Sequence, residues 1–75
     1  MKIELEQFYL NGDTVFIFDR RTKDSVRGMA WQGGLAHIVA INVNSKGETK
    51  HTFLPITPEI AKIAQSGQAI DTGVV

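Results

Sequence analysis

The chain has 75 residues, enough for one domain and close to the size at which the buried share of the surface becomes marginal for stability. Its 43% hydrophobic and 21% charged residues are typical of a folded globular protein, which excludes a disordered chain. Eight basic and eight acidic residues cancel, so attraction to nucleic acid or to an anionic membrane would need a local patch. We expect a single domain over residues 1–67, followed by a tail or oligomerisation arm over 68–75.

The sequence contains no cysteine, which excludes disulfides and thiolate chemistry and fits a reducing compartment. The first six residues alternate charged and apolar side chains, unlike a signal peptide. No window approaches the roughly 20 apolar residues that a membrane-spanning helix needs. These patterns predict a cytoplasmic protein with no membrane partner.

Two apolar stretches flank Asn11–Gly12, a dipeptide favoured in two-residue hairpin turns. The sequence therefore predicts a β-hairpin over about residues 2–19. The apolar spacing changes between Leu5 and Phe8, which indicates a bulge near Gln7.

Residues 20–34 show no strand or helix periodicity and carry several cations, so we predict a long basic loop there. Guanidinium groups pair with phosphates and carboxylates, and bases stack on an indole, so the segment suits an anionic small molecule, a nucleic acid or a protein partner. The alternative is that the charges only solvate the loop while the tryptophan fills the core. The candidate binding residues are Arg20, Arg21, Lys23, Arg27, Trp31 and Gln32.

The C-terminal half predicts a second hairpin over about 35–55 and a helix over 58–66. Thr57 and Pro58 are typical of a helix start, and Ile60, Ile63 and Ala64 share one helical face. The fold class is therefore α+β, mainly β, with two antiparallel hairpins in a small sheet or a partly closed barrel. The stretch 35–41 is apolar on both strand faces, which favours a homo-oligomer because one short helix cannot cover both.

Groups that could support catalysis or metal binding are sparse. His37 and His51 could face each other across neighbouring strands, but no third ligand follows at a recognisable spacing, so we predict neither a metal site nor a cofactor. The serines lie in turn-like contexts without a nucleophile motif. We therefore do not expect an enzyme.

Ala30–Trp31–Gln32–Gly33 is similar to a stretch of the plasmid-borne type II dihydrofolate reductases, which are small β-barrel tetramers, and residues 12–15 resemble their first strand. The likeness covers eight residues. The residues before Pro55 differ from those that carry activity in that family, so the resemblance implies at most a small barrel and no activity.

The sequence thus predicts a small non-catalytic binding or regulatory protein that contacts its partner through the basic segment 20–34. Two alternatives stay open. One is a structural subunit of a larger assembly without a ligand, and the other is a small-barrel enzyme whose site forms at a subunit interface.

Overall fold

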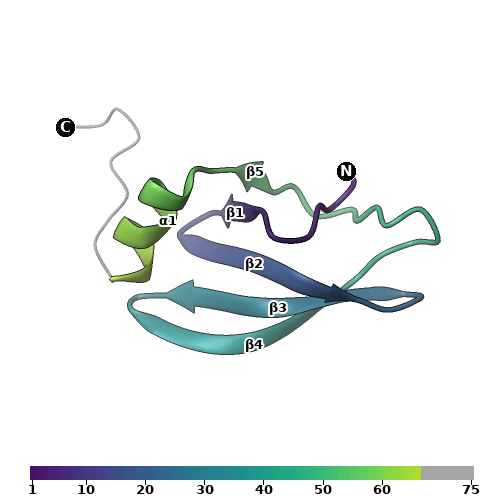
Figure 1. Ribbon diagram of the computed structural model, residues 1–75, viewed down its shortest axis with the longest axis horizontal. Helices are drawn as coiled ribbons and strands as arrows, with labels where there is room; N and C mark the ends of the chain where they lie inside the picture. The colour runs from purple at the N-terminus through teal and green to yellow at the C-terminus, as the bar shows by residue number, and fades with distance from the viewer. Residues whose placement is uncertain (67–75) are drawn as a thin grey trace.

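Five strands form one antiparallel sheet in the order β4-β3-β2-β1-β5, and one helix, α1, lies against it (Figure 1). The computed structural model describes residues 1–66. The mainly β class with one helix is confirmed, and within the described residues the sheet is open, with β4 and β5 at its two edges. The expected tail at 68–75 lies outside the described residues. The elements are β1 Phe8–Asn11, β2 Thr14–Arg21, β3 Ser25–Gln32, β4 Leu35–Asn42, β5 Leu54–Pro55 and α1 Pro58–Gln65.

The predicted first hairpin is confirmed as the pair β1–β2. Asn11 lies opposite Thr14, so the two turn residues are Gly12 and Asp13, one position later than the predicted Asn11–Gly12. Gly12 has the positive φ (63°) that a tight hairpin turn needs. The bulge expected near Gln7 is wrong. The chain instead turns at Glu6, whose φ is 64°, and the apolar spacing changes because the strand begins only after this turn.

The prediction of a loop over 20–34 is wrong, because β2 continues to Arg21 and β3 fills most of the remainder. The side chains of β3 alternate between the two faces of the sheet, but those on its buried side belong to Val26, Gly28 and Ala30. Two of these three residues are too small to produce the apolar signal by which an alternating strand is recognised.

The hairpin predicted over 35–55 is also wrong, because β4 pairs with β3 through a turn at Gly33–Gly34 and does not pair with β5. Residues 43–53 cross instead to the opposite edge of the sheet, where β5 pairs with β1 (Figure 1). The second strand of the predicted hairpin is represented only by a single bridge between Lys2 and Glu48 and by the short strand β5.

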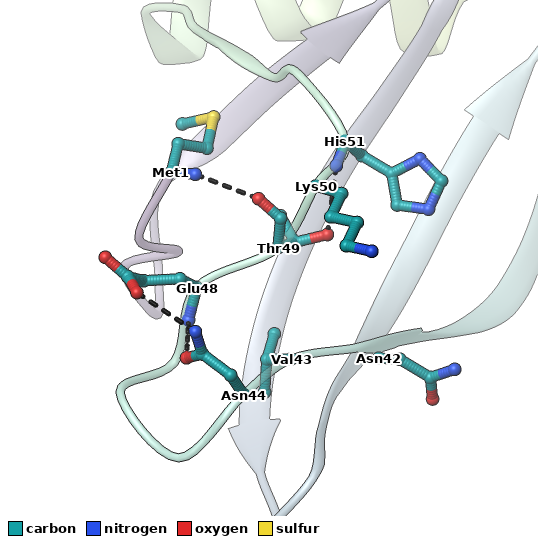
Figure 2. A pocket seen from close by; sticks show the side chains of 8 residues that line it. All are labelled: Met1, Asn42, Val43, Asn44, Glu48, Thr49, Lys50 and His51. Atoms are coloured by element: carbon teal, nitrogen blue, oxygen red, sulfur yellow. Dashed lines mark hydrogen bonds between the residues drawn. The ribbon is translucent and has the colours of Figure 1, made fainter.

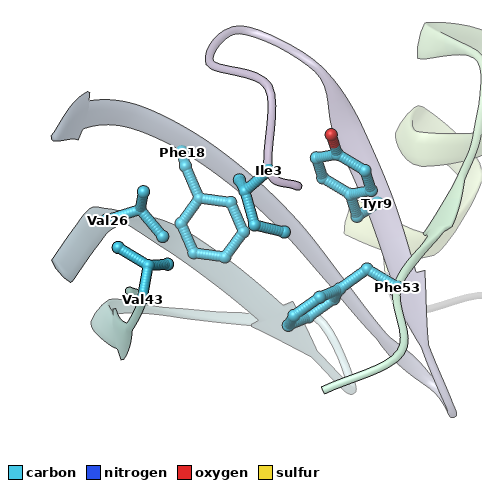
Figure 3. Packing of buried hydrophobic residues seen from close by; sticks show 6 residues of the cluster. All are labelled: Ile3, Tyr9, Phe18, Val26, Val43 and Phe53. Atoms are coloured by element: carbon cyan, nitrogen blue, oxygen red, sulfur yellow. The ribbon is translucent and has the colours of Figure 1, made fainter. Parts of the chain in front are cut away.

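One face of the sheet, here called the inner face, is covered by the N-terminal segment and by residues 43–53. Ile3 belongs to the first of these segments and Phe53 to the second, and both residues are at least 95% buried. Phe53 meets Tyr9 and Phe16 edge-on, at ring-centroid distances of 5.9 and 5.0 Å. The buried members of this cluster are Ile3, Tyr9, Phe18, Val26, Val43 and Phe53 (Figure 3).

The opposite face, here called the helix face, is covered by α1 at one end only. The Thr57 hydroxyl caps the helix by accepting a hydrogen bond from the Ile60 N–H at 3.2 Å. Ala61 and Ala64 are buried against Val15, whereas Ile60 and Ile63 are 37% and 44% exposed. The prediction that Ile60, Ile63 and Ala64 all face the sheet is therefore correct for Ala64 only, because the small alanines allow the helix to approach the sheet closely.

Candidate functional site

The structure separates the six predicted binding residues instead of gathering them in one loop. Arg20 and Arg27 lie opposite each other on β2 and β3, while Lys23 lies in the turn between these strands. Trp31 and Gln32 lie at the far end of β3. The candidate site is therefore reduced to the arginine pair with its neighbours.

A bulge in β2 creates this arginine pair. Phe18 lies opposite Gly28 and Arg20 lies opposite Arg27, so Asp19 is an extra residue without a partner of its own. An extra residue moves every following side chain to the other face of the sheet. Without the bulge Arg20 would lie on the inner face, and with it both guanidinium groups lie on the helix face.

The same bulge sends Arg21 to the inner side, where it has a structural role. Its Nη2 donates a hydrogen bond to the carbonyl oxygen of Ser45 at 3.1 Å. The guanidinium also lies against Gly47, where a Cβ atom would come within 2.9 Å of the Arg21 Nη1 and the arginine side chain would have to shift. Arg21 therefore holds the turn at 44–47 against the end of β2.

Trp31 and Gln32 also make contacts within the chain. The indole packs beside Val15 in the cluster beneath α1, which supports the alternative in which the tryptophan fills the core. The Gln32 Nε2 donates a hydrogen bond to the Asp13 Oδ1 at 3.2 Å and so links the turns of the two hairpins. Neither side chain reaches the arginine pair, which is several residues away along β3.

The arginine pair borders a shallow depression of about 260 Å³ on the helix face. Met29 and Ile38 are its apolar lining, and Asp19 contributes a carboxylate at its rim. Within residues 1–66, the Arg21 guanidinium donates a hydrogen bond, whereas those of Arg20 and Arg27 donate none. This surface can therefore offer two guanidinium groups to an anion beside an apolar contact. The lining residues are Asp19, Arg20, Arg27, Gly28, Met29 and Ile38.

A larger hollow of about 570 Å³ lies where residues 42–51 meet the N-terminus (Figure 2). No sequence pattern indicates this hollow, because its walls come from the crossing segment and from Met1, which are brought together only by the fold. The lining residues are Met1, Asn42, Val43, Asn44, Glu48, Thr49, Lys50 and His51.

Three of the side chains that line this hollow, those of Asn44, Glu48 and Thr49, make hydrogen bonds within the chain. The Asn44 Oδ1 accepts hydrogen bonds from the N–H groups of Lys46 and Glu48 at 2.9 and 3.0 Å, and its Nδ2 donates to the Glu48 Oε1. The carbonyl oxygen of Thr49 accepts from the terminal amine, and its hydroxyl accepts from the His51 N–H. These hydrogen bonds stabilise the fold of residues 44–51 and give no indication of a ligand.

The two histidines do not face each other as predicted. His37 lies opposite Ala30 on β4, whereas His51 lies in the crossing segment, with its ring 6.1 Å from that of Phe53. Within residues 1–66, no three His, Cys, Asp or Glu residues are grouped so that they could hold a metal ion.

Comparison of the chain with protein-family models, with curated proteins and with solved structures gave no match. In the described part of the chain, no helix combines the length and the apolar character that crossing a membrane requires.

Proposed function

We propose that this protein is a non-catalytic binding module that recognises an acidic segment of a partner protein through Arg20 and Arg27. The observation that carries the proposal is the position of these two arginines directly opposite each other on neighbouring strands. Like charges at such positions destabilise a sheet. A local feature that costs stability is expected where it serves a function.

The surroundings of the arginines favour an acidic protein segment over a nucleic acid. Single-stranded nucleic acids are bound by cations together with aromatic rings on which the bases stack. Trp31 lies beneath α1 and away from the pair, and the side chains beside the arginines are those of Met29 and Ile38. An apolar lining next to two guanidinium groups suits a segment in which carboxylates are interspersed with aliphatic residues.

The test is fluorescence anisotropy with a short labelled peptide in which Glu and Leu alternate. We expect the protein to bind this peptide, and the double variant Arg20→Ala/Arg27→Ala to bind it about tenfold more weakly, since each exposed ion pair contributes up to about 1 kcal/mol. Binding should also weaken at high salt, because exposed charges are screened.

The double variant Lys46→Ala/Lys62→Ala is the matched control, because it removes the same total charge at two exposed positions elsewhere. Its affinity should equal that of the wild type. Equal loss in both double variants would indicate attraction by overall charge and would overturn the proposal. Stronger binding of a labelled single-stranded oligonucleotide than of the peptide would identify nucleic acid as the ligand class.

A cytoplasmic location stays a prediction from the composition. The alternative of a structural subunit has its own supporting feature, the outer edge of β4.

A further inference from the structure

The outer edge of β4 lacks the features with which sheets prevent pairing at their edges. Natural edge strands are kept short or carry proline, lysine or a bulge. The opposite edge follows this rule, because β5 has two residues and one of them is Pro55. The strand β4 runs over eight residues, contains no proline, and has His37 as its one ionisable side chain.

This strand also carries the two most exposed large hydrophobic side chains among residues 1–66. Ile38 is 82% exposed and Leu35 is 75% exposed. They lie on opposite faces of the strand, since successive residues of a strand alternate in direction. The edge is therefore apolar on both faces, and its backbone N–H and C=O groups that point outward have no partner strand in the described chain.

On the helix face an apolar row leads across the sheet to this edge. Phe8, Ile17, Met29 and Ile38 are paired in register on four consecutive strands. The helix α1 packs on Phe8, at the far end of the row, and its cluster does not include the other three side chains. The row thus ends, uncovered, at the most exposed residue of the strand.

We propose that the occupant of this edge is β4 of a second copy of the chain. The two β4 strands pair antiparallel about a two-fold axis that passes midway between their Ile38 residues. The axis must be perpendicular to the sheet, so that each face of one copy continues into the same face of the other. Ile38 then lies opposite the Ile38 of the second copy, and Ala36 lies opposite its Ala40. The apolar row continues without interruption into the row of the second copy.

This register is preferred over its neighbours because it places both exposed side chains, Leu35 and Ile38, opposite apolar residues of the second copy. Leu35 lies opposite the Ile41 of the second copy on the inner face, where Ile41 already packs against the core. A two-fold axis at Val39 would instead place Leu35 opposite Val43, which lies beyond the end of β4 and is already buried. In the proposed register the two β4 strands bring no pair of like charges together, so no repulsion opposes self-association.

The contact is a single strand pair and is smaller than a standard interface of about 800 Å² per partner. We therefore expect a reversible dimer with a dissociation constant on the order of micromolar. Sedimentation velocity over a range of concentrations around this value should show a shift from monomer to dimer.

The variant Ile38→Lys places two ammonium groups against each other at the axis and should weaken dimerisation by at least about tenfold. It leaves the monomer intact, because the side chain is exposed there; an unchanged far-ultraviolet circular dichroism spectrum verifies this. Leu54→Lys is the matched control, since Leu54 is a 60% exposed hydrophobic residue on the opposite edge strand. This control should dimerise like the wild type.

Cross-linking tests the register itself, because the natural chain has no cysteine. Residues directly opposite on antiparallel strands have Cα atoms about 5 Å apart, within the range of a disulfide. Under oxidation Ile38→Cys should give covalent dimers, whereas Ala36→Cys should do so only when mixed with Ala40→Cys. A wild type that stays monomeric at all concentrations, or a dimer insensitive to Ile38→Lys, would overturn the proposal.

Discussion

Gly28 shows how one residue makes the arginine pair possible. It lies opposite Phe18, next to the bulge, and a Cβ atom there would collide with the carbonyl oxygen of Ile17. Its φ is not in the left-handed region, so the requirement for glycine comes from the close approach of two backbones. The bulge that brings Arg20 to the helix face therefore depends on glycine across the strand.

We expect Gly28→Ala to reduce the free energy of unfolding by about 3 kcal/mol, because the added methyl group meets backbone that cannot move without breaking the strand pair. Urea denaturation followed by circular dichroism measures the change. Gly12→Ala is the comparison, since a Cβ at Gly12 meets no atom within 4 Å and the cost comes from its positive φ alone. That cost should be about 1 kcal/mol. Equal losses in both variants would mean that the contact with Ile17 does not constrain the bulge.

Glycine is required at these two positions for different physical reasons, and only one of the two reasons is visible in the sequence. Gly12 belongs to a turn, and turn chemistry is local, so the Asn11–Gly12 pattern predicted the first hairpin, with its turn placed one residue too early. Gly28 is required by a contact with another strand, and no local pattern indicates such a contact. The bulge, and with it the pairing of Arg20 with Arg27, was therefore not predictable from the residues alone.

At the level of the elements, the helix was predicted well because its signals are also local. Thr57 and Pro58 define its start, and the structure places Thr57 at the cap. The strand β3 was missed for the opposite reason. Its buried positions carry small residues such as Gly28 and Ala30, and their burial depends on the neighbouring strands β2 and β4, which no local pattern indicates.

The cap yields a second stability prediction. Thr57→Ala removes the acceptor for the Ile60 N–H and should reduce the free energy of unfolding by about 1 kcal/mol. For a chain of this size the thermal midpoint should fall by about 4–8 °C. Thr52→Ala is the matched control, because Thr52 is exposed and its side chain makes no hydrogen bond among those of residues 1–66. A midpoint that falls equally in both variants would show that the hydroxyl of Thr57 does not stabilise the helix.

At the scale of the whole molecule, the two proposed surfaces meet at Ile38, which lines the depression beside the arginine pair and lies on the edge strand β4. The arginine pair lies on the helix face, and the two-fold axis at Ile38 is perpendicular to that face. From the spacing of residues and strands, the two Arg27 Cα atoms of a dimer would be about 20 Å apart. Association of two copies would thus present two anion-binding surfaces to a single partner, and an acidic segment that engages both would gain affinity from the linkage of its two contacts.

Dimerisation should also stabilise the fold in a concentration-dependent way. Binding that occurs in the folded state alone raises the free energy of unfolding by mass action, by about 2.7 kcal/mol when the partner is at 100 times the dissociation constant. The thermal midpoint of the wild type should therefore rise by a few degrees when the protein is concentrated from about 1 to about 100 µM. Differential scanning fluorimetry at several concentrations measures this shift through Trp31, which lies in the cluster beneath α1.

The midpoint of Ile38→Lys should not depend on concentration, since the substitution opposes association. Leu54→Lys should retain the wild-type slope. A concentration-independent midpoint in the wild type would show that the exposed edge of β4 does not associate with itself under these conditions. A slope that persists in Ile38→Lys would show that the copies associate through a different surface, because the two added ammonium groups lie at the proposed axis.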